Sequence, residues 1–443
     1  MNKLTRRHIL QAGGAGAMAA LSAWPAMPAL AAVTGGGYRA LVNLFMFGGN
    51  DGNNLLVPLD TTRYTQYQRV RPNLALPQSS LVPVLGTANY GLHPALSGIA
   101  GLVNSGQAAV LANVGPLMVP TTRAQYIARS VPLPANLYSH SDQQGAWQSA
   151  IVDQPARNGW GGRLLERALP DGMTNRGFGA ISVVGGNVWE LGDRGLSPYR
   201  VSPGGRFGLD FYTPGGTDPM STAITSLLGE SHADPMRQTW LNVMSRSIEV
   251  QRVLSAALAS TTLTTVFPST SLGQQLRMIA LLIAARGALG VPRQCFFASI
   301  GGFDTHGDDQ LARQNELFTE INGAVVAFQA AMVELGTSRD VTLFTGSDFG
   351  RNFPSNGEGT DHAWGNHHLV VGGSVRGARM YGAFPEMALG GPTDAGGQGV
   401  WIPSLATDQV SGELLRWYGA DLTTTDEVLP RLRYFTRDIG LMA

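Results

Sequence analysis

The chain has 443 residues, 44% of them hydrophobic, and its 31 basic residues balance its 31 acidic ones. A chain of this length and composition can bury a large core as one large domain or two smaller ones. The balanced charge excludes the broad basic surface that binds nucleic acid.

The first 32 residues have the pattern of an export signal. Arg6 and Arg7 precede an Ala- and Gly-rich apolar stretch, and small residues at 29 and 31 follow as a cleavage site. Paired arginines before a mildly apolar stretch are typical of the twin-arginine export route. The alternative is an ordinary N-terminal helix that carries two arginines. We expect a twin-arginine signal peptide at 1–32 and a periplasmic or secreted protein.

Apolar runs and amphipathic stretches alternate through residues 33–443. The run at 39–47 is almost continuously apolar, which is typical of a central parallel strand that helices cover on both faces. Further strands are expected at 108–114, 294–300 and 341–345, and helices at 95–104, 235–258, 272–289, 317–335 and 408–418. The alternation predicts one α/β domain with a mainly parallel central sheet sandwiched by helices.

Several local features refine this prediction. Ser141 and Gln144 have the spacing of a capping box, and Thr407 can cap the last helix. Cys295, the only cysteine, lies in an apolar run, so we expect a buried, unreactive thiol and no disulfide within the chain. The most apolar later segment, 272–291, is interrupted by two arginines and is expected to be a core helix and not a membrane span.

Residues 177–229 differ in composition from the rest of the chain. They are rich in Gly, Pro and aromatic residues and lack helical periodicity. We expect an inserted loop or β excursion, which is either a cap over the site or a plain surface insertion.

Polar residues follow the predicted strands, where α/β sheets bind ligands. They are Asp51, Asp304, His306, Asp348 and Arg351. Imidazole and carboxylate are ligands of zinc, manganese and iron, so these positions suggest a metal site.

Each of these residues also has a plainer interpretation. Asp304 and His306 are two positions apart, so an extended backbone would turn both to one side, but Asp304 could instead cap the next helix. Asp51 is either a ligand or a turn residue. Arg351 is placed to hold an anionic group or to pair with Asp348.

Three of the chain's eight histidines lie at positions 362, 367 and 368. They are too many for one role in the core, so at least one is expected to bind metal. His367 and His368 point in opposite directions at a strand start, and only one of them is expected to face the site. His140 and His306 also lie in turn segments next to apolar runs.

Ser139 and Ser141 are candidate nucleophiles at a helix N-terminus, where free N–H groups favour anions. For Ser141, capping is the alternative. The chain has no GxSxG elbow, no Walker-type loop and no GxGxxG after the first strand, so serine-hydrolase, nucleoside-triphosphatase and dinucleotide-binding functions lack support.

Short motifs along residues 33–443 match a known family. They are FGGNDG at 47–52, Ser139-His140 with Gln144, GWGGR at 159–163, GFDTH at 302–306, SDFGR at 347–351, TDHAWGNHH at 360–368, TDQ at 407–409 and LRWYG at 415–419. Through them the chain resembles the twin-arginine-exported domain of unknown function 1501 family, within the alkaline-phosphatase/sulfatase-like superfamily.

The resemblance implies an alkaline-phosphatase-like fold with a site for one or two divalent metal ions, zinc, manganese or calcium, that hydrolyses phosphate or sulfate esters. Carried onto this sequence, the metal ligands would be Asp51, Asp304, His306, Asp348 and either His362 or His367. Ser139 would be the nucleophile, and Arg351 would stabilise the transferred group. The superfamily usually has a histidine directly after the acid that matches Asp348, whereas this chain has Phe349.

Two hypotheses about function follow. The first is an exported metal-dependent hydrolase of phosphate or sulfate esters, with a small-molecule anionic ester as substrate. The second is a catalytically silent periplasmic protein that binds a ligand or a partner protein of the envelope on the same fold, because members of the resembled family are often encoded beside another exported protein. Neither hypothesis includes a nucleic-acid partner or a transmembrane segment after signal removal.

Overall fold

A computed structural model describes residue 33 and residues 36–84, 89–205, 209, 211–307 and 309–443. The predicted signal peptide at 1–32 lies outside these residues. No helix in the described ranges is long and apolar enough to cross a membrane.

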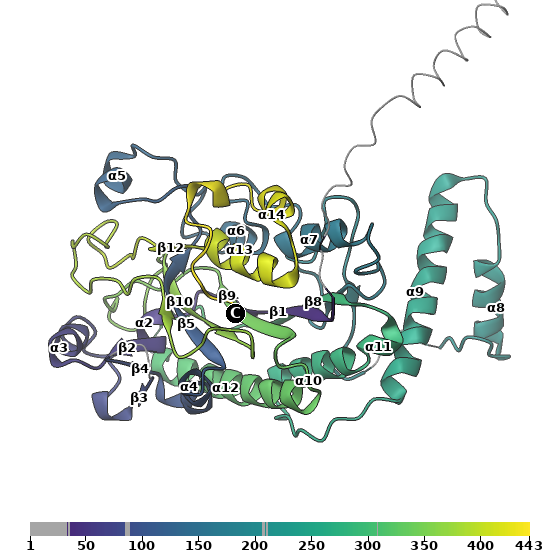
Figure 1. Ribbon diagram of the computed structural model, residues 1–443, viewed down its shortest axis with the longest axis horizontal. Coiled ribbons are helices and arrows are strands. Elements are labelled where there is room, and N and C mark those ends of the chain that lie inside the picture. Colours follow the sequence, from purple (N-terminus) through teal and green to yellow (C-terminus); the bar gives the residue numbers. More distant parts are fainter. Residues whose placement is uncertain (1–32, 34–35, 85–88, 206–208, 210, 308) are drawn as a thin grey trace, which may run out of the picture.

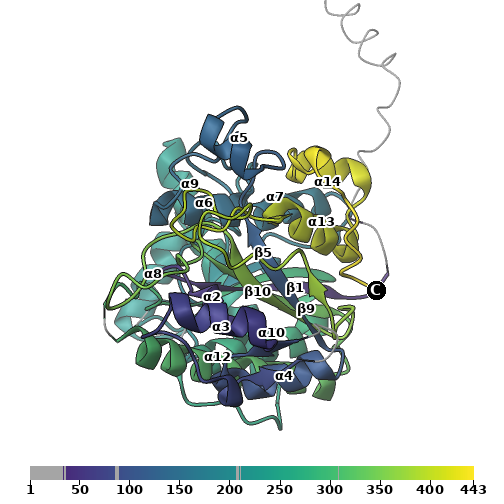
Figure 2. The same ribbon diagram turned by 90° about the vertical axis from the view of Figure 1, so that its left-hand side faces the viewer.

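The centre of the protein is a mixed, mostly parallel sheet with helices on both faces (Figures 1 and 2). In spatial order its strands are β11 (Met380–Tyr381), β5 (Ala108–Gly115), β10 (Asn366–Val371), β9 (Val341–Ser347), β1 (Arg39–Met46), β8 (Arg293–Ile300), β6 (Ala180–Ser182) and β7 (Tyr199–Arg200), while β12 (Leu405–Ala406) pairs with β5. Strand β1 runs parallel to both of its neighbours, β8 and β9. Strand β10 runs antiparallel to β9 and β5. The expected α/β class with a mainly parallel sheet is confirmed.

Alternate side chains of β1 enter two separate cores, as expected for a strand covered on both faces. Val42 and Leu44 pack with one set of helices, and Leu41 and Phe45 pack with the other. The first set is α4 (Ser97–Asn104), α10 (Ser271–Ala284) and α12 (Gln310–Glu334). The second set is α6 (His140–Ser149), α7 (Trp160–Ala168), α13 (Thr407–Tyr418) and α14 (Leu422–Val428). Figure 2 shows the two sets below and above the sheet.

Smaller elements surround this body. A second sheet of β2 (Leu56–Pro58), β4 (Tyr90–Leu92) and β3 (Val82–Pro83) lies with α2 (Gly52–Leu55) and α3 (Thr61–Val70) at one side. Helices α8 (Pro219–Leu228) and α9 (Pro235–Ala259) lie together at the other side, on the right in Figure 1. The remaining short elements are α5 (Arg123–Ala128), α11 (Arg286–Leu289), η1 (Gln78–Ser80), η2 (Pro94–Leu96) and η3 (Leu432–Tyr434).

The structure corrects three local expectations. Residues 177–229 contain the strands β6 and β7, which join the central sheet, and also the helix α8, which the expected loop or β excursion did not include. The capping box at Ser141 is wrong, since Ser139 is the N-cap residue of α6. Ala406, and not Thr407, is the N-cap residue of α13. Cys295 is buried as expected.

Candidate metal centre

The candidate site lies at the carboxyl ends of β1, β8 and β9, where three loops meet. Asp348 follows β9 directly, and Gly48 and Gly49 follow β1 with φ angles of +113° and +83°. A Cβ atom on Gly48 would overlap the backbone nitrogen of Asp304. Glycine at position 48 therefore allows the loop after β8 to lie directly against the loop after β1.

Three imidazoles converge on one carboxylate oxygen at this site. The Oδ1 atom of Asp304 lies 3.1 Å from the Nε2 atom of His306, 3.6 Å from that of His140 and 3.7 Å from that of His362. The histidines come from the start of α6, from the loop after β8 and from the loop before β10. The Asp304 side chain is 52% exposed, so the cluster is open to solvent.

The Nδ1 atom of each histidine faces an acceptor. His140 Nδ1 lies 2.6 Å from Asp348 Oδ2, and His362 Nδ1 lies 2.8 Å from the carbonyl oxygen of Tyr138. His306 Nδ1 lies 3.4 Å from a carboxylate oxygen of Asp361. An acceptor at Nδ1 places the ring proton there and leaves Nε2 without a proton. The lone pairs of all three imidazoles therefore lie on the converging Nε2 atoms.

Two of these nitrogens face each other as acceptors. Arg351 Nη1 lies 3.2 Å from His306 Nε2, and a guanidinium can only donate, so this Nε2 carries no proton. His306 Nε2 is 2.9 Å from His362 Nε2, which is also left without a proton when His362 is neutral. Two lone pairs at this distance repel each other unless a proton or a metal ion lies between them.

The protonation states favoured at the site are those that bind metal. Burial lowers the pKa of His362, and the positive charge of Arg351 lowers it further. Partial burial alone would raise the pKa of Asp304, but the hydrogen bond and charge of Arg351 outweigh burial, so this pKa lies below its usual value. A neutral imidazole and an ionised carboxylate are the forms that coordinate a metal ion.

The spacing fits a single transition-metal ion. Ligands around tetrahedral zinc, at zinc–nitrogen distances of about 2.0–2.1 Å, are separated from one another by roughly 3.3 Å. Asp304 Oδ1 lies 3.1 to 3.7 Å from the three Nε2 atoms, and His306 Nε2 lies 2.9 Å from His362 Nε2. The ligand atoms of His140, Asp304 and His362 all lie within 4.8 Å of one another. A donor set of two imidazoles and one carboxylate suits zinc and similar ions, whereas calcium prefers oxygen ligands alone.

Asp348 orients a ligand and does not itself join the cluster. Its Oδ2 atom accepts hydrogen bonds from Gln144 Nε2 at 2.9 Å and from the backbone nitrogen of Gly48 at 3.2 Å, in addition to facing His140. Its Oδ1 atom is buried and has no hydrogen-bond partner among the described residues. Asp348 thus fixes the ring of His140, in place of the expected direct role as a ligand.

Arg351 has a different role from either of those expected. It is fully buried, and its hydrogen bonds go to the carbonyl oxygens of Gly48, Gly49, Phe303 and Thr360 and to Asp304 Oδ1. These bonds and the contact to His306 occupy its five N–H groups, so none is free to hold an anionic substrate. The expected pairing with Asp348 is wrong, because the carboxylate that Arg351 contacts is Asp304, at 2.6 Å.

Asp51 is placed away from the cluster, contrary to the expectation that it binds metal. Its carboxylate forms a fully buried ion pair with Arg71, which follows α3, and accepts a hydrogen bond from Gln310 Nε2 at 2.7 Å. It also caps α2 through the backbone nitrogen of Asn53. All of its acceptor positions are therefore used by the fold.

Neither His367 nor His368 faces the site, so the prediction that one of them does is wrong. His367 stacks on Phe384 and accepts a hydrogen bond from the backbone nitrogen of Asn113. His368 lies 3.2 Å from Thr345 Oγ1 and packs against Trp147. Burial lowers the pKa of both histidines to about 3, so both remain neutral in the core.

The expected nucleophile and the second metal lack support from the geometry. The hydrogen bonds of Ser139 Oγ stay within its own helix, to Asp142 at 2.6 Å and to Ser141 at 3.4 Å. Phe349 packs its ring against the imidazoles of His140 and His362, with centroids 4.8 and 4.5 Å apart. It forms an apolar wall where the resembled superfamily usually has a histidine.

His140 is the member of the cluster that sequence reasoning did not assign. Its position next to a helix start in a motif shared with the resembled family was visible, but the same pattern also suits a helix cap. Its link to Asp348 spans 208 positions, and only the folded chain brings these two residues together.

Comparison with known families confirms the family resemblance. Residues 238–394 match the model of the family described as "Protein of unknown function (DUF1501)". This segment contains Asp304, His306, Asp348 and His362, while His140 lies outside it. No curated protein matches the chain.

Two solved structures illustrate the likeness to sulfatases. One is Ps i-CgsB in complex with k-i-k-neocarrahexaose, with 10% identity over 87% of this chain and 73% of that chain and a TM-score of 0.35. The other is the PsFucS1 sulfatase from Pseudoalteromonas sp., with 12% identity over 87% of this chain and 68% of that chain and a TM-score of 0.35. Likenesses with TM-scores this low carry no argument about the site or the substrate.

Proposed function

We propose that this chain is a metal-dependent hydrolase of phosphate or sulfate esters. The observation that carries the proposal is the convergence of three Nε2 lone pairs on Asp304 Oδ1, each imidazole being fixed by an acceptor at its Nδ1 atom. A set of oriented, unprotonated imidazoles around an ionised carboxylate is the donor set of a catalytic zinc-type site.

His140, His362 and Asp304 would hold the ion, and His306, whose Nε2 atom accepts a hydrogen bond from Arg351, would lie beside it. A bound divalent ion supplies Lewis-acid polarisation of an ester oxygen and makes water a stronger nucleophile at neutral pH. Asp348 holds the proton on His140 Nδ1 and thereby keeps the Nε2 lone pair directed into the cluster. Arg351 keeps Asp304 ionised, and Phe349 shields one side of the imidazoles from water.

A neighbouring cavity could admit the substrate. It has a volume of about 390 Å³ and is lined in part by Phe47, Asp142, Gln144 and Asn187. Gln144 also donates a hydrogen bond to Asp348, so the cavity adjoins the His140 side of the cluster. Its volume lies within the range of small-molecule sites.

Metal content and ester hydrolysis test the proposal together. We expect the purified protein to carry a transition metal in near-stoichiometric amount and to cleave an aryl phosphate or an aryl sulfate. Asp304→Ala, His140→Ala and His362→Ala should each lose both properties and retain the fold. His232→Ala is the matched control, because His232 lies near α9 and contacts Glu230. Metal-free, inactive protein after loading with zinc, manganese and calcium would contradict the proposal.

One observation favours a second function, a catalytically silent protein that binds a ligand or an envelope partner. The N–H groups of Arg351 are all used within the protein, and Ser139 bonds to Asp142, so neither expected catalytic side chain is free to act on a substrate. This function predicts stoichiometric metal without turnover of either ester. A pull-down of a partner that persists in Asp304→Ala would support it.

Export remains part of the proposal and rests on the pattern of residues 1–32. We expect the native chain to appear in the periplasmic or secreted fraction of a bacterial host. Replacing both Arg6 and Arg7 with lysine should retain it in the cytoplasm. Equal export of this variant would exclude the twin-arginine route.

A further inference from the structure

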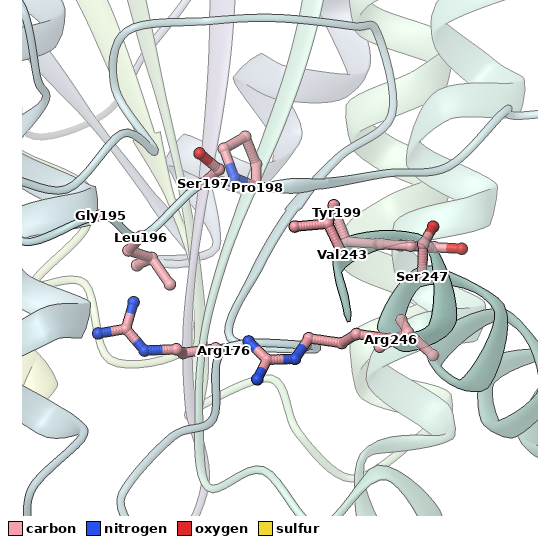
Figure 3. Close-up of a pocket in the computed structure, with 11 residues that line it drawn as sticks. Arg176, Gly195, Leu196, Ser197, Pro198, Tyr199, Val243, Arg246 and Ser247 are labelled. Carbon is pink, nitrogen blue, oxygen red and sulfur yellow. The ribbon is translucent and has the colours of Figure 1, made fainter. Parts of the chain in front are cut away.

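A second candidate binding site lies at the opposite end of the parallel strands. It is a cavity of about 380 Å³ between α9 and the segments that lead into β6 and β7 (Figure 3). Gly177 lines it three positions before β6 begins, and Tyr199 is the first residue of β7. Strands β6, β7 and β8 are parallel, and the histidine cluster follows the carboxyl ends of β1, β8 and β9. The cavity is therefore separate from the metal centre.

Two arginines give this cavity a positive charge. Arg176 and Arg246 both line it, and no acidic residue does. In Figure 3 the Arg246 side chain extends from α9 across the cavity toward the stem of Arg176. Within the described ranges, neither guanidinium has an ion pair with a carboxylate, whereas Arg252 on the same helix pairs with Glu249 at 2.7 Å. Two unpaired cations beside one cavity repel each other, and a bound anion would relieve that repulsion.

The other residues that line the cavity indicate what the rest of the ligand is. Leu196, Pro198, Val243 and Val250 offer apolar surface. Hydroxyl groups come from Ser197 and from Tyr199, which hydrogen-bonds to Ser247. A mainly apolar lining with a few polar groups is typical of a small-molecule site, and guanidinium groups match the geometry of tetrahedral oxyanions.

We propose that this cavity binds a small organic phosphate or sulfate monoester, with the oxyanion held by Arg176 and Arg246 and the organic part packed on Val243, Val250 and Leu196. The site is independent of the metal centre and does not require the proposed hydrolase activity. Phosphate and sulfate monoesters present the same tetrahedral oxyanion, so the experiment below distinguishes which of the two esters binds.

Binding of phenyl phosphate, phenyl sulfate and inorganic phosphate is measured by calorimetry on the full chain and on Asp304→Ala, which removes the metal centre as a competing site. We expect at least one phenyl ester to bind Asp304→Ala, and to bind it more tightly than inorganic phosphate does. The unsubstituted protein should bind that ester at this cavity with the same affinity, in addition to any binding or turnover at its metal centre. The preferred ester identifies the oxyanion. Failure of both esters to bind, or inorganic phosphate binding as tightly as the esters, would overturn the proposal.

Arginine variants locate the binding. In the Asp304→Ala background, Arg176→Ala and Arg246→Ala should each weaken binding about tenfold or more, because each removes a charge-assisted hydrogen bond. Arg237→Ala is the matched control, since Arg237 is an exposed residue of α9 that lines a different cavity. Undiminished binding in Arg176→Ala/Arg246→Ala, or an equal loss in Arg237→Ala, would show that these two arginines do not form the site.

Discussion

His140 Nδ1 lies 2.6 Å from Asp348 Oδ2, so a carboxylate fully buried after β9 sets the orientation of an imidazole at the start of α6. The pair links a strand end of the sheet to a helix on one face. The two acids of the site therefore have different roles. Asp304 faces the three Nε2 atoms, whereas Asp348 faces the Nδ1 atom of His140.

Replacing Asp348 with asparagine should weaken metal binding while the fold is retained. The amide is neutral and holds His140 Nδ1–H less firmly, and loss of such a supporting carboxylate typically lowers metal affinity about 10- to 100-fold. Competition with a chromophoric chelator measures the zinc affinity. Asp142→Asn is the control, because Asp142 lies on the same helix and bonds to Ser139. Unchanged zinc affinity in Asp348→Asn would show that Asp348 does not orient a ligand.

Replacing Asp51 with asparagine should destabilise the protein without changing its metal affinity. Arg71 and Asp51 form an ion pair with almost no exposed surface, so the substitution leaves a buried guanidinium without its counterion. Breaking such a pair typically lowers the free energy of unfolding by about 3–5 kcal/mol. Urea denaturation measures the loss, and zinc titration of the folded variant distinguishes this role from a ligand role. A fall in zinc affinity would restore Asp51 as a ligand.

Replacing Arg351 with glutamine should lower both stability and metal affinity. Four carbonyl oxygens lose a donor, and leaving buried acceptors unpaired should lower the free energy of unfolding by at least about 2 kcal/mol. Zinc affinity should fall in the folded variant, because the loops that carry the cluster lose the side chain that ties them together. Arg313→Gln, which removes an exposed arginine that pairs with Glu316, should change neither quantity. Unchanged or tighter zinc binding in Arg351→Gln would show that the guanidinium does not support the site.

Glu190 should make stability fall as the pH rises. It is fully buried beside Asn187, and burial raises its pKa from 4.5 to about 8. The folded state therefore binds more protons than the unfolded state between these values. Its contribution to stability is complete below pH 4.5 and is lost toward pH 8, with a slope of up to about 1.4 kcal/mol per pH unit.

The comparison of wild type with Glu190→Gln isolates this effect. Urea midpoints at pH 5, 6, 7 and 8 should fall more steeply for the wild type than for the variant. Glu249→Gln, at an exposed position on α9, should follow the wild type. Parallel curves for the wild type and Glu190→Gln would mean that Glu190 does not titrate in this range.

The sheet was predictable because its central strands are buried on both faces. The apolar runs at 39–47, 294–300 and 341–345 match β1, β8 and β9 to within two residues, since such strands need apolar side chains at nearly every position. Asp304 and His306 could be paired for a related reason, because their contact depends on local backbone direction alone.

The remaining site residues depend on contacts that the sequence pattern does not contain. Asp51 is removed from the site by Arg71, the C-cap residue of α3, which also donates hydrogen bonds to the carbonyl oxygens of residues 352 and 353. The ladder between β10 and β5 is irregular between Asn366 and His368, and both faces of β10 are buried, so His367 and His368 both enter the core. Alternation along a strand predicts that neighbouring side chains point to opposite faces of the sheet. It does not predict what each side chain contacts there.

The hydrogen bonds of Arg351 bear on the order in which the site is made. One side chain ties together the loops after β1 and β8 and the loop before β10 by their carbonyl oxygens. In many metalloproteins the bound ion itself draws such loops together, and the protein does not fold without the ion. Here Arg351 holds the loops together by hydrogen bonds. We therefore expect the loops to take up their positions before the ion binds, and to keep them when a chelator removes the ion.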